Sequence, residues 1–235
     1  MKLFLEDAYA REAQATVLAI TEAGILLDRT IFYANSGGQP GDTGMIGATP
    51  IIDTRKGPED TVLHIPAPGA ALPTVGETVA LTLDWERRHR HMRMHTTMHL
   101  LCALLPGIYA TGNQIGADKS RLDFDLPDPP AKEDLTERLN ALIAQAHPTG
   151  TRWISGEELD AKPDLVRTLS VQPPRGSGQI RLVRIGPENA PIDLQPCGGT
   201  HVANTAEIGR AEISKIENKG KQNRRLHIIL TGEKP

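Results

Sequence analysis

One long segment without helix breakers constrains the fold of this chain more than any other feature. WERRHRHMRMHTTMHLLCALL runs from Trp85 to Leu105 without Gly or Pro, with Asp84 in front of it as an N-cap candidate and Pro106 behind it. The pattern predicts a helix over residues 85–105. Because the preceding sequence has a different pattern, we place a domain boundary between residues 84 and 85.

The region before this helix is typical of a small all-β unit. From Ala15 to Leu83 it consists of short β-like runs separated by Gly and Pro, namely ATVLAI, ILLDRTIFY, TVLHI and TVALTL. Such spacing predicts a barrel or a sandwich. Residues 35–44, NSGGQPGDTG, hold four glycines in ten positions. We therefore expect an ordered loop there.

The region after the helix mixes helix and strand signals. KEDLTERLNALIAQAH, residues 132–147, predicts an amphipathic helix, and IRLVRI, residues 180–185, alternates like a half-buried strand. Residues 211–230 predict a hairpin that turns at Lys219-Gly220-Lys221. Residues 85–235 are thus expected to form an α+β domain, and the chain as a whole belongs to the α+β class. The apolar stripe of the amphipathic helix is Leu135, Leu139, Leu142, Ile143 and Ala146.

Charge divides the chain into the same two parts. Residues 1–84 hold 5 basic and 11 acidic side chains, net −6, and the remainder holds 21 and 18, net +3. Basic residues gather in two clusters that either track a phosphate backbone or form a solvated face. The first cluster is Arg87, Arg88, Arg90 and Arg93, and the second is Arg210, Lys215, Lys219, Lys221, Arg224 and Arg225.

Several classes of protein are disfavoured. No apolar run approaches the roughly 18 residues that span a bilayer, and the N-terminus becomes acidic too early for a signal peptide, so we expect a cytoplasmic protein without membrane contact. Two cysteines, Cys102 and Cys197, are too few for a disulfide framework. In a reducing compartment each is a metal ligand, a nucleophile or a small core residue.

Histidines on the predicted helix are candidate metal ligands. His95 and His99 lie four residues apart, hence on one face about one turn apart, although two unrelated imidazoles would give the same pattern. His91 and Cys102 share that face. At about 1.5 Å rise per residue, His91 and His99 are about 12 Å apart along the axis, so one ion cannot bind all three histidines. Cys102 stands in LLCALL, which favours a buried apolar role.

A second pair completes a possible ligand set. In PCGGTH, Cys197 and His201 are again four residues apart, and the Gly-Gly pair between them lets the backbone bend so that both side chains converge. Together with His95 and His99 they supply one sulfur and three nitrogens, a set suited to one tetrahedral Zn²⁺ per chain. Thr96 follows His95 where an HExxH site has Glu, so the helix carries no such general base.

Five segments resemble one protein family. HTTMH and CGGTH are similar to the motifs of the editing domain that alanyl-tRNA synthetases share with free-standing alanyl-tRNA editing proteins of the AlaX type. FYANSGGQPGDTG resembles the glycine-rich motif of the family's N-terminal β-barrel, with Ala34 where Pro is frequent. TGNQIGADKSRLDFD and EIGRAEISKIENKGKQNRRLHI resemble its core stretch and closing hairpin. The resemblance covers nearly the whole chain and is weakest over residues 127–179.

The resemblance implies a trans-acting deacylase of Ser-tRNA(Ala), extending to Gly-tRNA(Ala), that serves translation fidelity with Zn²⁺ held by the residues that match His95, His99, Cys197 and His201. Without a long C-terminal extension, a monomer is expected. Ester hydrolysis needs hydrogen-bond donors for the developing oxyanion, which makes several polar residues candidates for the substrate site. Each of them also has an ordinary structural interpretation. They are Thr96 as a partner of the serine hydroxyl, Gln114, Arg121 and Gln39 near the aminoacyl end or terminal adenosine, and Gly37 and Gly38 as points of close backbone approach.

Two alternatives remain open. A threonyl-type editing deacylase shares HxxxH and CxxxH, but NSGGQPGDTG argues against it. A non-catalytic tRNA-binding module with a structural zinc is also possible, although structural zinc sites favour more than one cysteine.

Overall fold

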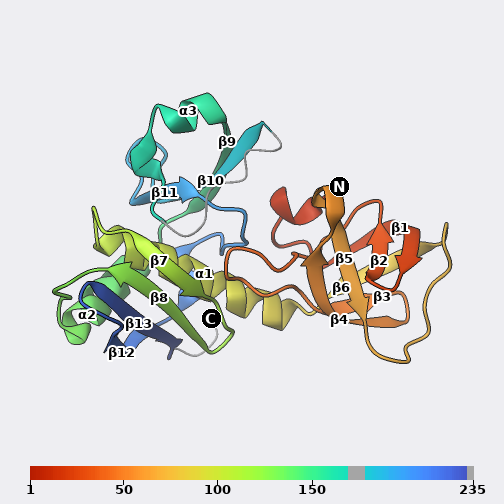
Figure 1. Ribbon diagram of the computed structural model, residues 1–235, viewed down its shortest axis with the longest axis horizontal. Helices are drawn as coiled ribbons and strands as arrows, with labels where there is room; N and C mark the ends of the chain where they lie inside the picture. Colours follow the sequence, from red (N-terminus) through yellow and green to blue (C-terminus); the bar gives the residue numbers. More distant parts are fainter. Residues whose placement is uncertain (169–177, 232–235) are drawn as a thin grey trace. The chain divides into compact units, whose positions relative to one another are not determined.

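The computed structural model describes residues 1–168 and 178–231, and the chain divides into two compact units, Met1–His91 and Met92–Pro235 (Figure 1). The predicted long helix is confirmed as α1, Trp85–Leu104. The division falls within α1 rather than in front of it, because the first turns of the helix are bound to the first unit through Arg88.

The first unit is a closed six-stranded barrel, as the short β-like runs predicted. The strand order is β1-β2-β5-β4-β3-β6, and closure leaves no unpaired sheet edge. The two strands that the sequence did not indicate are β3, of three residues, and β4, which begins with Thr-Pro. The bounds are β1 Glu12–Thr21, β2 Gly24–Leu27, β3 Gly44–Ile46, β4 Thr49–Lys56, β5 Val62–Pro66 and β6 Thr78–Leu83.

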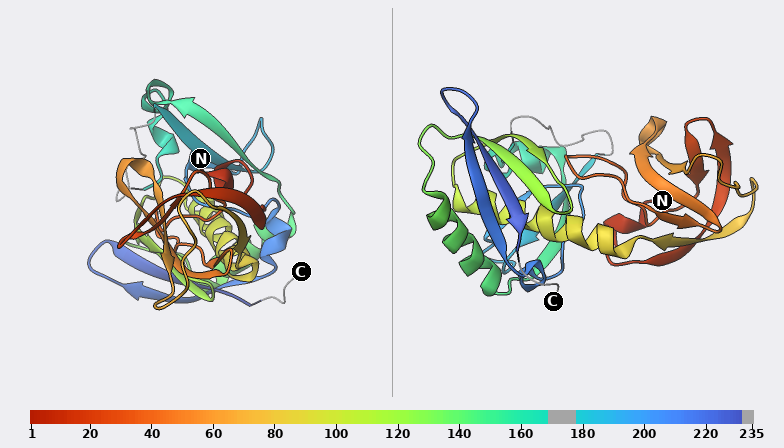
Figure 2. Two further views of the ribbon diagram at one scale, coloured as in Figure 1. Left: turned by 90° about the vertical axis from the view of Figure 1, so that its right-hand side faces the viewer. Right: turned by 90° about the horizontal axis from the view of Figure 1, so that it is seen from below.

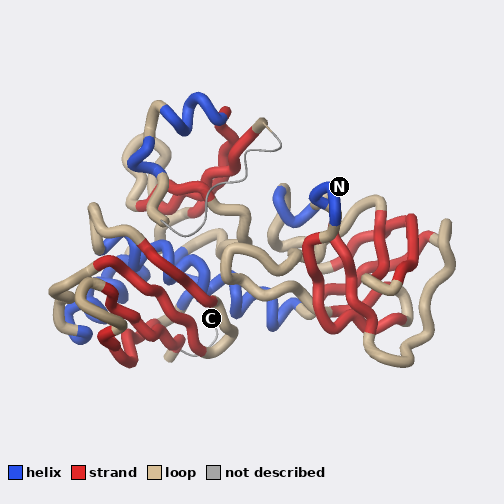
Figure 3. Tube along the Cα trace, viewed as in Figure 1, coloured by secondary structure: helices blue, strands red, loops and turns tan. Residues whose placement is uncertain are grey.

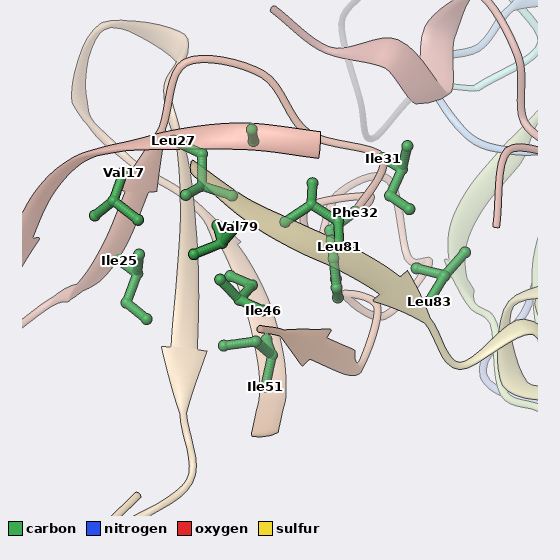
Figure 4. Packing of buried hydrophobic residues seen from close by; sticks show 11 residues of the cluster. Val17, Ile25, Leu27, Ile31, Phe32, Ile46, Ile51, Val79, Leu81 and Leu83 are labelled. Atoms are coloured by element: carbon green, nitrogen blue, oxygen red, sulfur yellow. The ribbon is translucent and has the colours of Figure 1, made fainter. Parts of the chain in front are cut away.

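Aliphatic side chains fill the barrel. Figure 4 shows residues from several strands and from the segment after β2 directed into one interior, with Ile25, Ile46 and Leu81 fully buried. In β6 every second residue is buried, so Val79, Leu81 and Leu83 face the core. This alternation explains why TVALTL was recognisable as a strand in the sequence.

An ionic contact fixes the glycine-rich loop between β2 and β3. Asp42 accepts hydrogen bonds from Arg88 Nε (3.0 Å to each carboxylate oxygen) and from the backbone N–H of Tyr33 (2.5 Å). Both charged side chains are buried, with exposures of 0% for Arg88 and 1% for Asp42. Gly41 lies so close to β4 that a Cβ there would stand 2.0 Å from the Thr54 carbonyl oxygen. The loop is therefore ordered, as predicted.

The second unit combines helices with two antiparallel sheets, which confirms the α+β expectation. The four-stranded sheet has the order β12-β13-β8-β7, and the three-stranded sheet has the order β11-β10-β9 (Figure 3). The predicted hairpin is β12 and β13. The bounds are β7 Ala110–Gln114, β8 Lys119–Asp125, α2 Lys132–Ala144, β9 Thr149–Ser155, α3 Gly156–Asp160, β10 Gln179–Ile185, β11 Asp193–Pro196, β12 Ala211–Asn218 and β13 Asn223–Leu230.

Helix α2 packs along β12 (Figure 2). Its predicted apolar stripe buries Leu135, Leu139 and Ile143. The side-chain amide of Asn140 accepts a hydrogen bond from the Ala211 N–H (3.1 Å) and donates one to the Ala211 carbonyl (2.7 Å). β10 differs from its predicted half-buried pattern, because four consecutive residues from Ile180 are buried. Among the described residues, no helix is long and apolar enough to cross a membrane.

Candidate metal centre

Helix α1 presents the first pair of candidate ligands. His95 and His99 are 7% and 6% exposed, and their ring centroids lie 5.2 Å apart. The helix begins after Asp84, whose carboxylate accepts from the Arg87 N–H (3.2 Å). The short spacing along a regular helix therefore places both imidazoles on one buried face.

The second pair comes from the loop that follows β11. Arg181 on β10 shapes this loop, because its Nη1 donates to the carbonyl oxygens of Cys197 and Gly199, both at 2.9 Å. The Cys197 N–H in turn donates to the Arg181 carbonyl (3.1 Å), which extends the strand pairing by one residue. The loop then brings the His201 ring to 4.2 Å from His95 and 4.5 Å from His99, measured between centroids.

The four side chains converge on one point. One ligand atom from each of His95, His99, Cys197 and His201 lies within 4.8 Å of the others. Cys197 Sγ is 3.5 Å from His95 Nε2 and 3.3 Å from His201 Nε2. Ligand atoms that share a tetrahedral Zn²⁺ at about 2.0–2.3 Å are about 3.3–3.7 Å apart. These two sulfur–nitrogen distances and the donor types therefore fit a zinc ion.

The electrostatics of the cluster favour the metal-binding form of Cys197. Burial opposes ionisation of the Cys197 thiol, but the charges and hydrogen bonds of His95 and His201 outweigh it and hold the pKa of Cys197 well below its ordinary value. Burial opposes protonation of His99, but Asp193 and Cys197 raise the pKa of His99 to about 10, so a metal ion that binds His99 would have to displace a proton from it. Cys197 is thus held as a thiolate, the form that binds metal ions.

Two polar side chains outside the ligand set, Asp193 and Gln195, lie next to the ligand His99. Asp193 Oδ2 accepts from His99 Nδ1 (2.9 Å) and from Gln195 Nε2 (2.9 Å). We did not predict Asp193 or Gln195 as site residues. The signal was present, because the period of two along a strand places residues 193, 195 and 197 on one face.

Thr96 has partners other than the one expected. Its hydroxyl donates to the Met92 carbonyl (2.9 Å), lies 3.2 Å from His201 Nδ1 and accepts from the Val202 N–H (3.2 Å). With three protein partners on one buried hydroxyl, the structure does not support Thr96 as the partner of a substrate hydroxyl.

Cys102 and His91, the competing candidates on α1, stand outside the group of four among the described residues. Cys102 is buried, and burial raises the pKa of its thiol to about 12. It therefore remains a neutral thiol in apolar surroundings, as LLCALL indicated.

Gln114 and Arg121 lie opposite each other on β7 and β8. Arg121 Nε donates to Gln114 Oε1 (3.2 Å), and Arg121 Nη1 donates to Asp123 (2.9 Å). In the first unit, Gly37 and Gly38 are exposed and adopt positive φ angles of 56° and 86°, whereas Gln39 is fully buried. The buried Gln39 side chain is therefore a weaker candidate for substrate contact than the two glycines.

The two basic clusters differ in burial and in their partners. Arg88 and Arg93 are 0% and 4% exposed, and Arg93 donates to the Ile208 carbonyl (2.6 Å). These two arginines therefore cannot track a phosphate backbone, contrary to the expectation for the first cluster. On the hairpin, Arg225 pairs with Asp123 (2.7 Å) and Lys219 with Glu217 (3.1 Å).

Comparisons with known proteins agree with this geometry. A family model described as the threonyl and alanyl tRNA synthetase second additional domain matches residues 180–227, and one described as tRNA synthetases class II (A) matches residues 4–87. The chain is 37% identical to an alanyl-tRNA editing protein AlaX-M of Methanosarcina acetivorans, over 97% of this chain and 98% of that protein. It is 32% identical to the AlaX-M of Saccharolobus solfataricus, with the same coverage. It is also 35% identical to an alanine-tRNA ligase of Pyrobaculum arsenaticum, over 92% of this chain and 25% of that enzyme.

Proposed function

This chain belongs to the alanyl-tRNA editing proteins of the AlaX-M type, and on that premise we propose that it hydrolyses the ester bond of Ser-tRNA(Ala), and of Gly-tRNA(Ala), at a zinc centre. The observation that carries the proposal is the buried convergence of one thiolate and three imidazoles, within 4.8 Å of one another, in a member of an editing family. The chain acts as an aminoacyl-tRNA deacylase, and its substrate partner is tRNA.

The metal centre has one thiolate and three imidazoles, from His95, His99, Cys197 and His201. When bound there, Zn²⁺ supplies positive charge that orients or polarises an aminoacyl ester. Four protein ligands complete a tetrahedral shell, so direct binding of substrate requires that one ligand yield its place. The same four ligands are thus compatible with two roles for the ion: it either orders the site or contacts the substrate.

Gln114 and Arg121 are proposed to donate hydrogen bonds to the substrate. Gln114 Oε1 already accepts from Arg121, which orients the amide so that Nε2 is the atom available to a ligand. Asp123 holds the Arg121 guanidinium in the same network. Fixed donors of this kind stabilise the negative charge that develops on an ester carbonyl oxygen during hydrolysis.

The basic hairpin of β12 and β13 is proposed to contact tRNA phosphates. Two carboxylates order the cations of the hairpin, since Asp123 of β8 pairs with Arg225, and Glu217 pairs with Lys215 and Lys219. These contacts keep the pKa values of both Asp123 and Glu217 below their ordinary values, so the network persists at neutral pH. Ordered cations on a sheet face suit a phosphate backbone.

The decisive experiment measures deacylation of Ser-tRNA(Ala), Gly-tRNA(Ala), Ala-tRNA(Ala) and Ser-tRNA(Thr) by the full chain. We expect hydrolysis of the first two with Ala-tRNA(Ala) spared, loss of activity after chelation, and recovery with one Zn²⁺ per chain. Preference for Ser-tRNA(Thr) would favour a threonyl-type deacylase instead. Binding of tRNA without any hydrolysis would favour a non-catalytic module with a structural zinc.

A further inference from the structure

We infer that Thr96 and Asp193 are positioning residues of the metal centre. Each holds Nδ1 of one histidine from behind the ring, so that Nε2 of that histidine faces the metal position. This inference rests on the proposed zinc centre and assigns no contact with the substrate. It also replaces the role that the sequence suggested for Thr96.

The hydrogen bonds of Thr96 determine the tautomer of His201. A hydroxyl has one proton, and Thr96 donates it to the Met92 carbonyl oxygen (2.9 Å). Toward His201 Nδ1, at 3.2 Å, the hydroxyl can therefore only accept, which places the imidazole proton on Nδ1. His201 Nε2 is then an unprotonated donor atom, and it lies 3.3 Å from Cys197 Sγ.

Thr96 also joins the two halves of the ligand set. It stands on α1 between His95 and His99, and its oxygen accepts from the N–H of Val202, the residue after His201 (3.2 Å). One fully buried side chain thus fixes the helix, the backbone of the CGGTH loop and the ring of a ligand. A hydrophobic residue of the same shape would remove all three contacts.

Asp193 performs the same task for His99 with a charge. It is 5% exposed, and its Oδ2 lies 2.9 Å from His99 Nδ1 and 2.9 Å from Gln195 Nε2. The carboxylate accepts the Nδ1 proton, which leaves His99 Nε2 toward the other ligands. Carboxylate and hydroxyl partners behind a ligating histidine fix its orientation and increase its basicity, and their removal typically weakens metal binding about 10- to 100-fold.

Thr97 provides a matched control for Thr96. It is the next residue of α1, it is also fully buried, and its hydroxyl also donates to the carbonyl four residues earlier, that of Arg93 (2.8 Å). The described residues give its hydroxyl no histidine partner. Thr96→Val and Thr97→Val therefore remove the same group from the same kind of helical environment, and only the former removes support from a ligand.

The test measures the dissociation constant of Zn²⁺ by competition with a chromophoric chelator, on the full chain, together with the absorption spectrum of bound Co²⁺. We expect Thr96→Val to weaken Zn²⁺ binding about 10- to 100-fold and to change the Co²⁺ spectrum. Thr96→Ser keeps the hydroxyl and should restore most of the affinity. Thr97→Val should bind like the unmodified chain, and Asp193→Ala should lose at least as much affinity as Thr96→Val.

Each contrary outcome is distinct. Equal Zn²⁺ affinities for Thr96→Val and Thr97→Val, whether both normal or both reduced, would overturn the role of Thr96, because the effect would then be absent or due to packing alone. Unchanged affinity in Asp193→Ala would overturn the role of Asp193. Failure of the unmodified chain to bind Zn²⁺ would overturn the metal centre itself, and with it this inference.

Discussion

The two units bury histidines in opposite ways. In the barrel, His64 is fully buried, with Nε2 2.8 Å from the Thr30 hydroxyl and Nδ1 3.0 Å from the Ile25 carbonyl oxygen. Both nitrogens therefore have ordinary protein partners, and burial lowers the pKa of His64 to about 4. In the second unit, Nδ1 of His99 and of His201 also has a partner, but the opposite side of each ring faces other ligands. A buried histidine is a ligand candidate when its second nitrogen faces other potential ligands.

The largest effect is expected at the thiolate of the cluster. Cys197→Ala removes the only sulfur of the ligand set, so we expect Zn²⁺ affinity and deacylation to fall roughly a hundredfold or more. Metal content by mass spectrometry and a deacylation assay measure the two losses. Cys102→Ala is the control, because Cys102 lies outside the group of four. This variant should keep both its Zn²⁺ affinity and its deacylation activity. Full zinc retention by Cys197→Ala would contradict the assignment of the cluster as the zinc site. The histidines of the second unit would then no longer differ in role from His64 of the barrel.

A second substitution tests the barrel without touching the cluster. Asp42→Ala leaves the buried guanidinium of Arg88 without its carboxylate, which typically costs about 3–5 kcal/mol. We expect this loss in the free energy of unfolding measured with denaturant. Zn²⁺ stoichiometry of the folded protein should remain unchanged. A loss smaller than about 1 kcal/mol would mean that the ion pair is not what fixes the glycine-rich loop.

Mild acid should destabilise the barrel through His64. Its native pKa of about 4 lies below the ordinary 6.5, so the unfolded chain binds a proton first as the pH falls. The stabilising contribution is complete above pH 6.5, is lost between pH 6.5 and about 4, and amounts to roughly 3 kcal/mol.

Comparing the unfolding free energies of the unmodified chain and His64→Gln at pH 7 and pH 4.5 isolates the contribution of His64 to stability. The advantage of the unmodified chain should shrink toward the lower pH. An advantage that does not depend on pH would show that burial in the barrel does not lower the pKa of His64.

The charge difference between the units predicts where tRNA binds. Salt should weaken tRNA binding with a log–log slope of about 0.7–0.9 for each phosphate contact. Replacing Lys219, Lys221, Arg224 and Arg225 with Gln should flatten this slope. Lys221→Gln alone should lower the slope by about 0.7–0.9, the contribution of one phosphate contact. An unchanged slope and affinity in the fourfold variant would show that the hairpin is only a solvated face.

The smallest effect concerns the glycine-rich loop. Gly37 has a φ of 56°, and a Cβ there would meet no atom within 4 Å. Asn tolerates this conformation, so Gly37→Asn adds bulk with little strain. If the loop backbone approaches the aminoacyl end, deacylation should slow several-fold with unchanged thermal stability. Normal kinetics would assign the loop a structural role within the barrel.

Local patterns predicted much of the fold. The breaker-free run gave α1 to within one residue, and the turn residues at Lys219-Gly220-Lys221 lie between the strands of the hairpin. Spacing also selected the four side chains that converge. In each case the signal lies within a few residues of sequence.

What the sequence did not predict depends on distant partners. Arg88 and Arg93 were grouped with surface cations, but Asp42 and the Ile208 carbonyl, far away in the chain, bind them in the interior. Thr96 was expected to face the substrate because His201, 105 residues later, could not be placed against it. A polar side chain near a ligand can serve either the substrate or the ligand, and only tertiary structure distinguishes the two.

The position of Arg88 has a consequence for dissecting this protein into fragments. A fragment that begins at Trp85 keeps all of α1 but leaves Arg88 without Asp42, the carboxylate that neutralises it. A fragment that begins at Met92 avoids this charge, but it removes the first two turns of the helix and brings the frayed end within one turn of His95. An isolated editing fragment should therefore begin at Trp85 and carry Arg88→Gln.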